Sequence, residues 1–310
     1  MFYSIAENWS NGPPPADCEK SHAVVIGTYQ RGHLLERSLA CYARQSIGQR
    51  NFALVVIDDG STDGTEQLLR GFAAGSLVDV HYFRLEKEPG TWRDSASFIN
   101  MGLSYALHVI QAEYVFATHP EIMPGDDCLN MSSTVRPGTY IGHKGYYLTA
   151  EQQAAIDTVD WRTAVVNVRY LPGFYAKHPD IKGPTSDYQH DRMDQHKKWE
   201  SWIFGGMHRD TWLWFGGLSE YETWGSVDVD FLARRRVCAL ETYTPQTNSC
   251  YVIHQNHDDP TKNVPTPRDM NAALGAVPRY LDPLSALKPE LLNPGRWSKK
   301  VVHDGLELAR

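Results

Sequence analysis

The stretch "FALVVIDDGSTDGTEQLLRGF", residues 52–72, contains the signals of a strand, a turn and a helix in succession. Its apolar first part predicts a buried strand, which ends in two carboxylates, Asp58 and Asp59. Gly60 and the polar residues after it predict a tight turn. Thr62 or Asp63 is the expected cap of the following helix.

The same order of elements recurs on both sides of this stretch. "HAVVIGTY" (22–29) predicts a strand and 33–45 a helix, while a strand over 78–86 precedes a helix over 95–112. "EYVFAT" (113–118) predicts a fourth strand. Alternating strands and helices indicate an α/β fold with a mostly parallel, Rossmann-like central sheet flanked by helices. Ligands of such sheets bind at the carboxyl ends of the strands, so the polar residues there are the candidates for function.

Composition and charge exclude several classes of protein. A net charge of -7 without a dense basic run argues against nucleic acid as a partner, although a phosphorylated small molecule is still allowed. The five cysteines show neither close spacing nor CxxC pairs, so neither a disulfide framework nor a zinc knuckle is indicated. The start of the chain lacks a basic segment followed by an apolar core, and no apolar run is long enough to span a bilayer, so we expect a cytoplasmic protein without a membrane span. The sequence predicts no oligomeric state.

Two groups of motifs resemble known glycosyltransferases. "VVIGTYQR" (24–31), "IDDGSTDGT" (57–65) and the strand 113–118 with its polar end are similar in layout to the family 2 glycosyltransferases, which have the GT-A fold. "FGGLSEYETWGSVDVDFLARR" (215–235) resembles the WGxEDxD segment of β-1,4-galactosyltransferases and polypeptide N-acetylgalactosaminyltransferases.

The resemblance implies one large domain with two functional halves. We expect a leader over 1–21, a nucleotide-sugar-binding half over 22–130 and an acceptor-binding and catalytic half over 131–257. Within the second half, the long polar segment at about 171–200 is typical of a mobile loop. The remaining 258–310 would be a C-terminal tail.

On the nucleotide side, the resemblance assigns roles to five residues. Thr28 and Tyr29 would lie beside the base, and Asp58 with Asp59 would accept hydrogen bonds from the base or ribose. Arg93 would meet a phosphate, because a guanidinium presents paired donors to phosphate oxygens. The alternatives are an ordinary strand-to-helix turn for the aspartates and a solvated loop arginine for Arg93.

In the WGxEDxD-like stretch, Trp224, Gly225, Asp228 and Asp230 match the motif, and Val227 replaces its Glu. The resemblance implies that Asp228 is the general base of an inverting transfer, taking the proton of the acceptor hydroxyl. Retention of configuration stays open, since retaining relatives carry the same motif. Asp230 is better suited to bracing the helix that follows.

"GGMHRD" (205–210) matches the region where relatives bring a glycine-rich backbone close to the donor sugar and the acceptor. Gly205 and Gly206 are therefore expected at the donor and acceptor site together with Trp224, Gly225 and Asp230. Ordinary turns use glycine in the same way.

The family's DxD motif, which holds a divalent cation, aligns with "HPE" at 119–121. His119 and Glu121 take the positions of the two aspartates, and His254 or His257 of "VIHQNHDD" is the expected third ligand. Glu suits Mn²⁺ or Mg²⁺, whereas a neutral imidazole favours Mn²⁺ or softer ions. The alternative is a site without metal, in which Arg93, Arg209 or His119 neutralises the diphosphate.

The leading hypothesis is an enzyme that transfers a sugar from a UDP, GDP or dTDP donor to an acceptor hydroxyl or amine on a small molecule, glycan or natural product. A catalytically degenerate protein that binds a sugar nucleotide or glycan is one alternative. A nucleotidyltransferase is another, although "GTYQRGH" (27–33) is poor in glycine for a phosphate loop.

Overall fold

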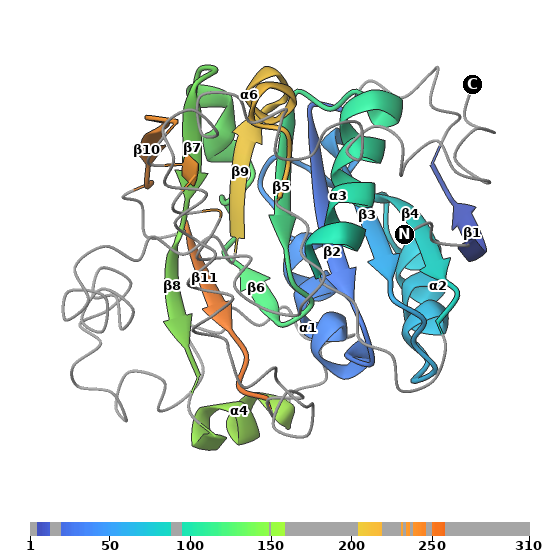
Figure 1. The fold of residues 1–310 in the computed structure, drawn as a ribbon. Coiled ribbons are helices and arrows are strands. Elements are labelled where there is room, and N and C mark those ends of the chain that lie inside the picture. The colour runs from blue at the N-terminus through green and yellow to red at the C-terminus, as the bar shows by residue number, and fades with distance from the viewer. Residues whose placement is uncertain are drawn as a thin grey trace, which may run out of the picture.

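Four parallel strands form the centre of the main sheet in the computed structural model (Figure 1). The structure describes residues 5–12, 20–87, 95–148, 150–158, 204–218, 231, 234–235, 238–245 and 250–257. The central strands run in the order β4, β3, β2, β5. Their bounds are β2 (His22–Thr28), β3 (Phe52–Asp58), β4 (Asp79–Leu85) and β5 (Tyr114–Thr118). These strands and the parallel sheet confirm the sequence prediction.

Helices cover both faces of this sheet, which explains why its strands are apolar on both sides. Along β2, Ala23 and Val25 belong to one core cluster, and Val24 and Ile26 belong to the other. The first cluster includes buried apolar residues of α3 (Ser95–Tyr105). The second includes Leu35 and Leu39 of α1 (Gly32–Tyr42) and Leu69 of α2 (Thr65–Gly75). Successive residues of a strand point to opposite faces, so a strand between two helical layers needs no polar side.

Strands that the sequence analysis did not predict extend the sheet at both edges. β1 (Ile5–Ser10), which lies in the segment assigned to a leader, pairs antiparallel with β4. On the other side, β9 (Phe204–His208) runs antiparallel to β5 and to β7 (Thr139–Gly142), and β10 (Glu241–Tyr243) pairs parallel with β7. Within the described part of the chain the main sheet has eight strands.

A smaller sheet brings the histidine-containing strand of the second half to the carboxyl end of β5. Its order is β6, β11, β8, and β11 (Tyr251–His254) pairs antiparallel with β6 (Ile122–Pro124) and parallel with β8 (Lys144–Tyr147). In this register His254 lies opposite Ile122, the neighbour of Glu121. The two segments that were predicted to bind one metal ion therefore lie next to each other in the structure.

Helical segments complete the described structure. The predicted helix 95–112 is α-helical as far as Tyr105 and continues as a π-helical turn to Ile110. The shorter segments are η2 (Gln49–Asn51), the π-helical turn η3 (Ala106–Ile110), η4 (Asn130–Thr134), α4 (Ala150–Asp157) and α6 (Arg209–Phe215). Among the residues that the structure describes, no helix has the length and apolar character needed to cross a bilayer. The predicted loop at about 171–200 and the tail 258–310 lie outside the described residues.

Candidate active site

The turn after β3 is held by Asp58. This carboxylate is fully buried; its Oδ1 accepts the Ser61 backbone N–H at 2.8 Å and its Oδ2 accepts the Tyr82 hydroxyl at 2.7 Å. Burial raises the pKa of Asp58, and the hydrogen bonds from Ser61 and Tyr82 oppose that effect. Gly60, with φ +87°, supplies the left-handed conformation that the turn requires. In the structure Asp58 thus braces the turn from the inside.

Asp59, Lys87 and Tyr29 form a second group beside this turn. The Asp59 carboxylate makes a close ion pair with the Lys87 ammonium, and both side chains are buried. Lys87 Nζ also lies 3.4 Å from the centre of the Tyr29 ring, within the range of a cation–π contact. Lys87 follows β4 and was not among the predicted site residues. Its position after a strand was the signal that could have revealed it.

The segment after β2 connects this group to the second part of the site. Thr28 ends β2, and its Oγ1 is buried without a hydrogen bond to the described residues. Gln30 has φ +52°, and its backbone N–H donates to Ser61 Oγ at 2.8 Å. The turn after β3 therefore fixes the backbone between Tyr29 and Arg31, whose side chains contact different groups.

The turn after β3 also supports the two helices behind it. The expected cap, Thr62 or Asp63, is displaced by one position, because Gly64 is the N-cap residue of α2. Asp63 nevertheless accepts the Thr65 N–H at 3.2 Å through Oδ1, and the Gly32 N–H at 2.8 Å through Oδ2. One carboxylate thereby satisfies a donor in the first turn of both α1 and α2.

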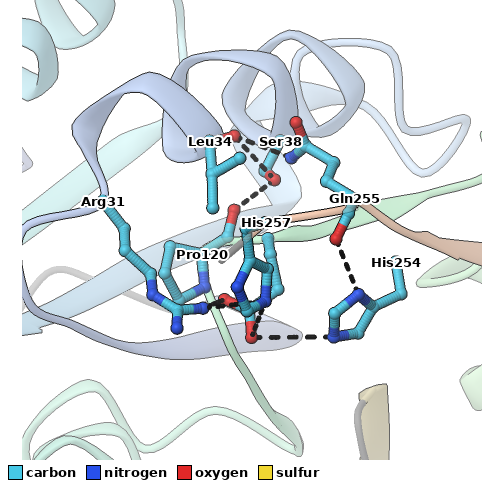
Figure 2. Close-up of polar contacts among 8 residues, drawn as sticks. Arg31, Leu34, Ser38, Pro120, His254, Gln255 and His257 are labelled. Carbon is cyan, nitrogen blue, oxygen red and sulfur yellow. Dashed lines mark hydrogen bonds and ion pairs between the residues drawn. The ribbon is translucent and has the colours of Figure 1, made fainter. Parts of the chain in front are cut away.

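Glu121, His254 and His257 come together at the carboxyl end of β5. Figure 2 shows the two histidines beside Pro120, the residue before Glu121. Glu121 Oε1 is 3.9 Å from His254 Nε2 and 3.8 Å from His257 Nε2. One ligand atom from each residue lies within 4.8 Å of the other two. His119 is not in this set, although a charge on its ring acts on Glu121. The arrangement matches the expected metal site in three of its four residues.

Hydrogen bonds fix which nitrogen each ring presents. A backbone carbonyl only accepts, so the 2.8 Å contact between His254 Nδ1 and the Gln255 carbonyl requires the proton on Nδ1. Arginine only donates, so the 3.1 Å contact from Arg31 Nη1 to His257 Nε2 requires a lone pair on Nε2. A neutral His254 with its proton on Nδ1 has its lone pair on Nε2, which lies 3.9 Å from Glu121 Oε1, as in metal-binding histidines. The lone pair of His257 Nε2 accepts from Arg31.

Charges around Glu121 keep its carboxylate ionised despite burial. Burial alone would raise its pKa, but His119, Arg31, His254 and His257 together hold it at about 2. Burial lowers the pKa of His254 to about 4, so this ring is neutral at pH 7. At neutral pH the cluster thus offers one anionic oxygen and a neutral His254 nitrogen.

Helix α1 and the backbone around it hold these residues in place. Ser38 Oγ donates to the Pro120 carbonyl at 2.6 Å, next to Glu121 (Figure 2). Gln255 Nε2 donates to the Leu34 carbonyl at 2.9 Å, and the Gln255 N–H donates to the Glu121 carbonyl at 3.0 Å. The two segments that carry the ligands are therefore bonded both to α1 and to each other.

These residues fit a divalent transition metal. Two ligands bound to one ion at about 2.1 Å lie at most about 4.2 Å apart, so separations of 3.8 and 3.9 Å are compatible with a shared ion. Glu121 Oε2 is buried and accepts no aligned hydrogen bond among the described residues, and its ion-pair partner is Arg31 Nη1 at 2.9 Å. One carboxylate and two imidazoles suit Mn²⁺ better than Mg²⁺.

The structure gives Gly205 and Gly206 a packing role. Both lie within β9, where a Cβ on Gly205 would approach the Tyr140 Oη to 2.0 Å and a Cβ on Gly206 would approach the Phe116 ring to 2.5 Å. Packing against these two aromatic rings accounts for the missing side chains without a bound sugar.

Five of the predicted site residues lie outside the described part of the chain. They are Arg93, Trp224, Gly225, Asp228 and Asp230. Their roles stay predictions.

Comparisons with known proteins agree with this fold. Residues 23–106 match the family model described as glycosyl transferase family 2. Over 50 residues the chain is 48% identical to validoxylamine A glucosyltransferase of Streptomyces hygroscopicus subsp. jinggangensis. These 50 residues are 16% of this chain and 12% of that protein. Over 77 residues it is 30% identical to an uncharacterized glycosyltransferase of Mycoplasma pneumoniae, or 25% of each chain. The chain thus matches a quarter or less of the length of these two curated relatives.

Among solved structures, residues 1–349 of S. aureus TarS in complex with UDP-GlcNAc superpose with a TM-score of 0.56 at 16% identity. The superposition covers 89% of this chain and 72% of that one. The family match at 23–106 contains the motifs at 24–31 and 57–65. It reaches neither the strand 113–118 with the HPE triplet nor the WGxEDxD-like stretch. The chain has the GT-A fold, as the resemblance of its strand-end motifs predicted.

Proposed function

We propose that this protein is a glycosyltransferase that uses a nucleotide diphosphate sugar as donor. The observation that carries the proposal is the meeting of Glu121, His254 and His257 at the carboxyl end of β5, beside the strand ends that hold Tyr29 and Asp59. A parallel sheet binds its ligand at this edge. The match of residues 23–106 to glycosyl transferase family 2 supports the same reaction class.

The nucleotide would bind over the segments that follow β2, β3 and β4. Tyr29 would offer a ring face to the base. Thr28 would offer a buried hydroxyl that has no hydrogen bond to the residues that the structure describes. Asp59 would accept from the base or ribose, while Asp58 maintains the turn that positions it. Arg93 would donate to a phosphate, because its guanidinium forms paired bonds with phosphate oxygens.

Glu121, His254 and His257 would hold a divalent ion, with Mn²⁺ favoured by the two imidazoles. Such an ion, when bound, stabilises negative charge that develops on the leaving diphosphate. The protein's own part is to keep Glu121 ionised and His254 in the Nδ1–H tautomer, so that the ligands are oriented before donor arrives.

Asp228 is proposed as the general base of an inverting reaction. It would take the proton from the acceptor hydroxyl as that oxygen attacks the sugar carbon and the bond to the diphosphate breaks. Trp224, Gly225 and Asp230 would shape the acceptor side, as would the backbone of Gly205 and Gly206. The acceptor class, a small molecule, glycan or natural product, follows from the resemblance alone.

The experiment uses the 310-residue chain with a panel of UDP, GDP and dTDP sugars, with and without Mn²⁺. We expect one donor class to be hydrolysed slowly without an acceptor, and Mn²⁺ to increase the rate. Glu121→Ala should abolish the Mn²⁺ dependence of donor binding, because it removes the only carboxylate of the ligand set. Asp228→Asn should lose turnover and still bind the donor.

Binding of a sugar nucleotide without hydrolysis or transfer for any donor would favour the alternative of a degenerate sugar-nucleotide-binding protein. An unchanged Mn²⁺ titration in Glu121→Ala would remove Glu121 from the metal site. Near-normal turnover in Asp228→Asn would exclude Asp228 as the base.

A further inference from the structure

Arg31 lies against two of the three candidate metal ligands (Figure 2). Its Nη1 is 2.9 Å from Glu121 Oε2 and 3.1 Å from His257 Nε2. The side chain comes from the segment between β2 and α1 and is 18% exposed, so most of the guanidinium lies inside the protein. An arginine carries only donors, and it can take part in this cluster as a cation but never as a ligand.

Arg31 and a metal ion would compete for the same lone pair, the one on His257 Nε2. An imidazole has at most one ring lone pair, and in His257 the hydrogen bond donated by Arg31 to Nε2 uses it. Coordination of an ion through Nε2 requires the same lone pair. A divalent ion would also lie beside the guanidinium at a short distance in a buried site, where like charges repel strongly.

We propose that Arg31 is an internal competitor of the metal ion. In the metal-free protein its guanidinium neutralises Glu121 and occupies His257, and a divalent ion binds only when Arg31 leaves. This inference rests on the proposed function for the identity of the cluster as a metal centre. It adds that Arg31 sets the affinity of the site for the metal ion and couples metal binding to donor binding.

The competition has a consequence for the donor. The apparent affinity of a ligand falls by the fraction of protein that is competent to bind it. A displaced guanidinium at the end of β2 is also a partner for a diphosphate, because its fork matches phosphate oxygens. The diphosphate therefore draws Arg31 away from Glu121 and His257, and metal and donor bind together more strongly than each binds alone.

The test measures Mn²⁺ binding to the full chain without donor, by electron paramagnetic resonance of the free ion. If Arg31 occupies the centre more than about nine-tenths of the time, Arg31→Met should bind Mn²⁺ about tenfold or more tightly than the wild type. Adding UDP should strengthen Mn²⁺ binding more in the wild type than in Arg31→Met. Arg70→Met is the matched control, since Arg70 pairs with Glu7 and Glu66 elsewhere on the surface.

Equal or weaker Mn²⁺ binding by a folded Arg31→Met variant overturns the proposal, and so does an equal effect of UDP on both proteins. Crystals of the wild type soaked in MnCl₂ provide a measurement that needs no variant. We expect the anomalous signal of the ion to lie between Glu121, His254 and His257. We also expect Arg31 to have moved away from His257. An ion with Arg31 still bonded to His257 Nε2 would refute the competition, while the transfer assay tests the proposed function separately.

Discussion

Three buried carboxylates of the site differ in how their charge is compensated. Neutral donors, Ser61 and Tyr82, satisfy Asp58, whereas Asp59 has the ammonium of Lys87. Glu121 has Arg31 on one oxygen and two histidines near the other. Both oxygens of Asp58 already serve the protein, so its replacement should disturb the fold first. Glu121 has one partner, Arg31, that an ion would replace, so the replacement of Glu121 should disturb binding first.

The first prediction at this scale concerns Tyr82, whose hydroxyl donates to Asp58 Oδ2 at 2.7 Å in the core. Tyr82→Phe leaves that oxygen of a buried carboxylate without its donor. A hydrogen bond to a charged group is worth about 1.5–3 kcal/mol, so the free energy of unfolding should fall by about 2 kcal/mol. Urea denaturation at pH 7 measures this change.

Tyr114→Phe is the matched control for Tyr82→Phe. The Tyr114 hydroxyl is also buried, but it donates to a neutral acceptor, the Val135 carbonyl, at 2.9 Å. Its loss should cost about 1 kcal/mol. An equal or larger cost for Tyr114→Phe would contradict the view that Asp58 is a charged anchor of the turn.

The resemblance of 119–121 to the family's DxD motif indicated His119 and Glu121, and the same resemblance indicated His254 or His257 as a third ligand. It did not indicate Arg31 or Lys87. Arg31 meets His257 across 226 residues of chain, and the two ion pairs depend on side chains from separate strand ends that only the folded sheet brings together. A single sequence shows which residue types follow each strand, but not which of them pair.

At the scale of elements, the sequence predicted the central strands and missed the edges, for a physical reason. β2 and β3 are continuous apolar runs because helices bury both of their faces. β9, "FGGMH", contains two glycines, which disfavour a strand unless close packing requires them. β1 alternates between partly buried and exposed residues at a sheet edge and carries a weak apolar signal.

The prediction for β9 concerns Gly205. Because the Cβ of Gly205→Ala would lie 2.0 Å from Tyr140 Oη, the core must shift, at a cost of about 1–3 kcal/mol or more. Tyr140→Leu should relieve the clash, so the double variant should be more stable than the sum of the two single changes predicts. A double-mutant cycle of unfolding free energies measures the coupling, which should exceed about 1 kcal/mol.

Gly71→Ala is the control for this substitution. Gly71 is an exposed residue of α2 with no atom within 4 Å of the added Cβ, so alanine should raise the stability by about 0.5–1 kcal/mol. If Gly205→Ala left stability unchanged and weakened binding of the acceptor, the packing explanation would be wrong. The role in the donor and acceptor site predicted from the sequence would then be favoured.

At the scale of the whole molecule, histidines buried in different regions make folding sensitive to acid. Burial lowers the pKa of His22, His81, His143 and His254 to about 4, from 6.5 in an unfolded chain. Between these values the unfolded chain binds more protons than the folded protein, so stability is complete above pH 6.5 and decreases as the pH falls toward 4. Each such group contributes at most about 1.4 kcal/mol per pH unit.

His81 offers a test of this linkage, because it lies away from the metal ligands on β4 and its Nδ1 is 3.1 Å from the Tyr105 hydroxyl. His81→Phe keeps an aromatic ring at this position and removes one titratable group. The unfolding free energy of metal-free protein, followed from pH 7 to pH 5, should then fall less steeply than in the wild type, by up to about 1.4 kcal/mol per pH unit. Tyr105→Phe breaks the same contact without removing the histidine, and it should lower stability while leaving the slope nearly unchanged. If His81→Phe had the wild-type slope, His81 would have to be protonated equally in both states, and burial would not control its charge.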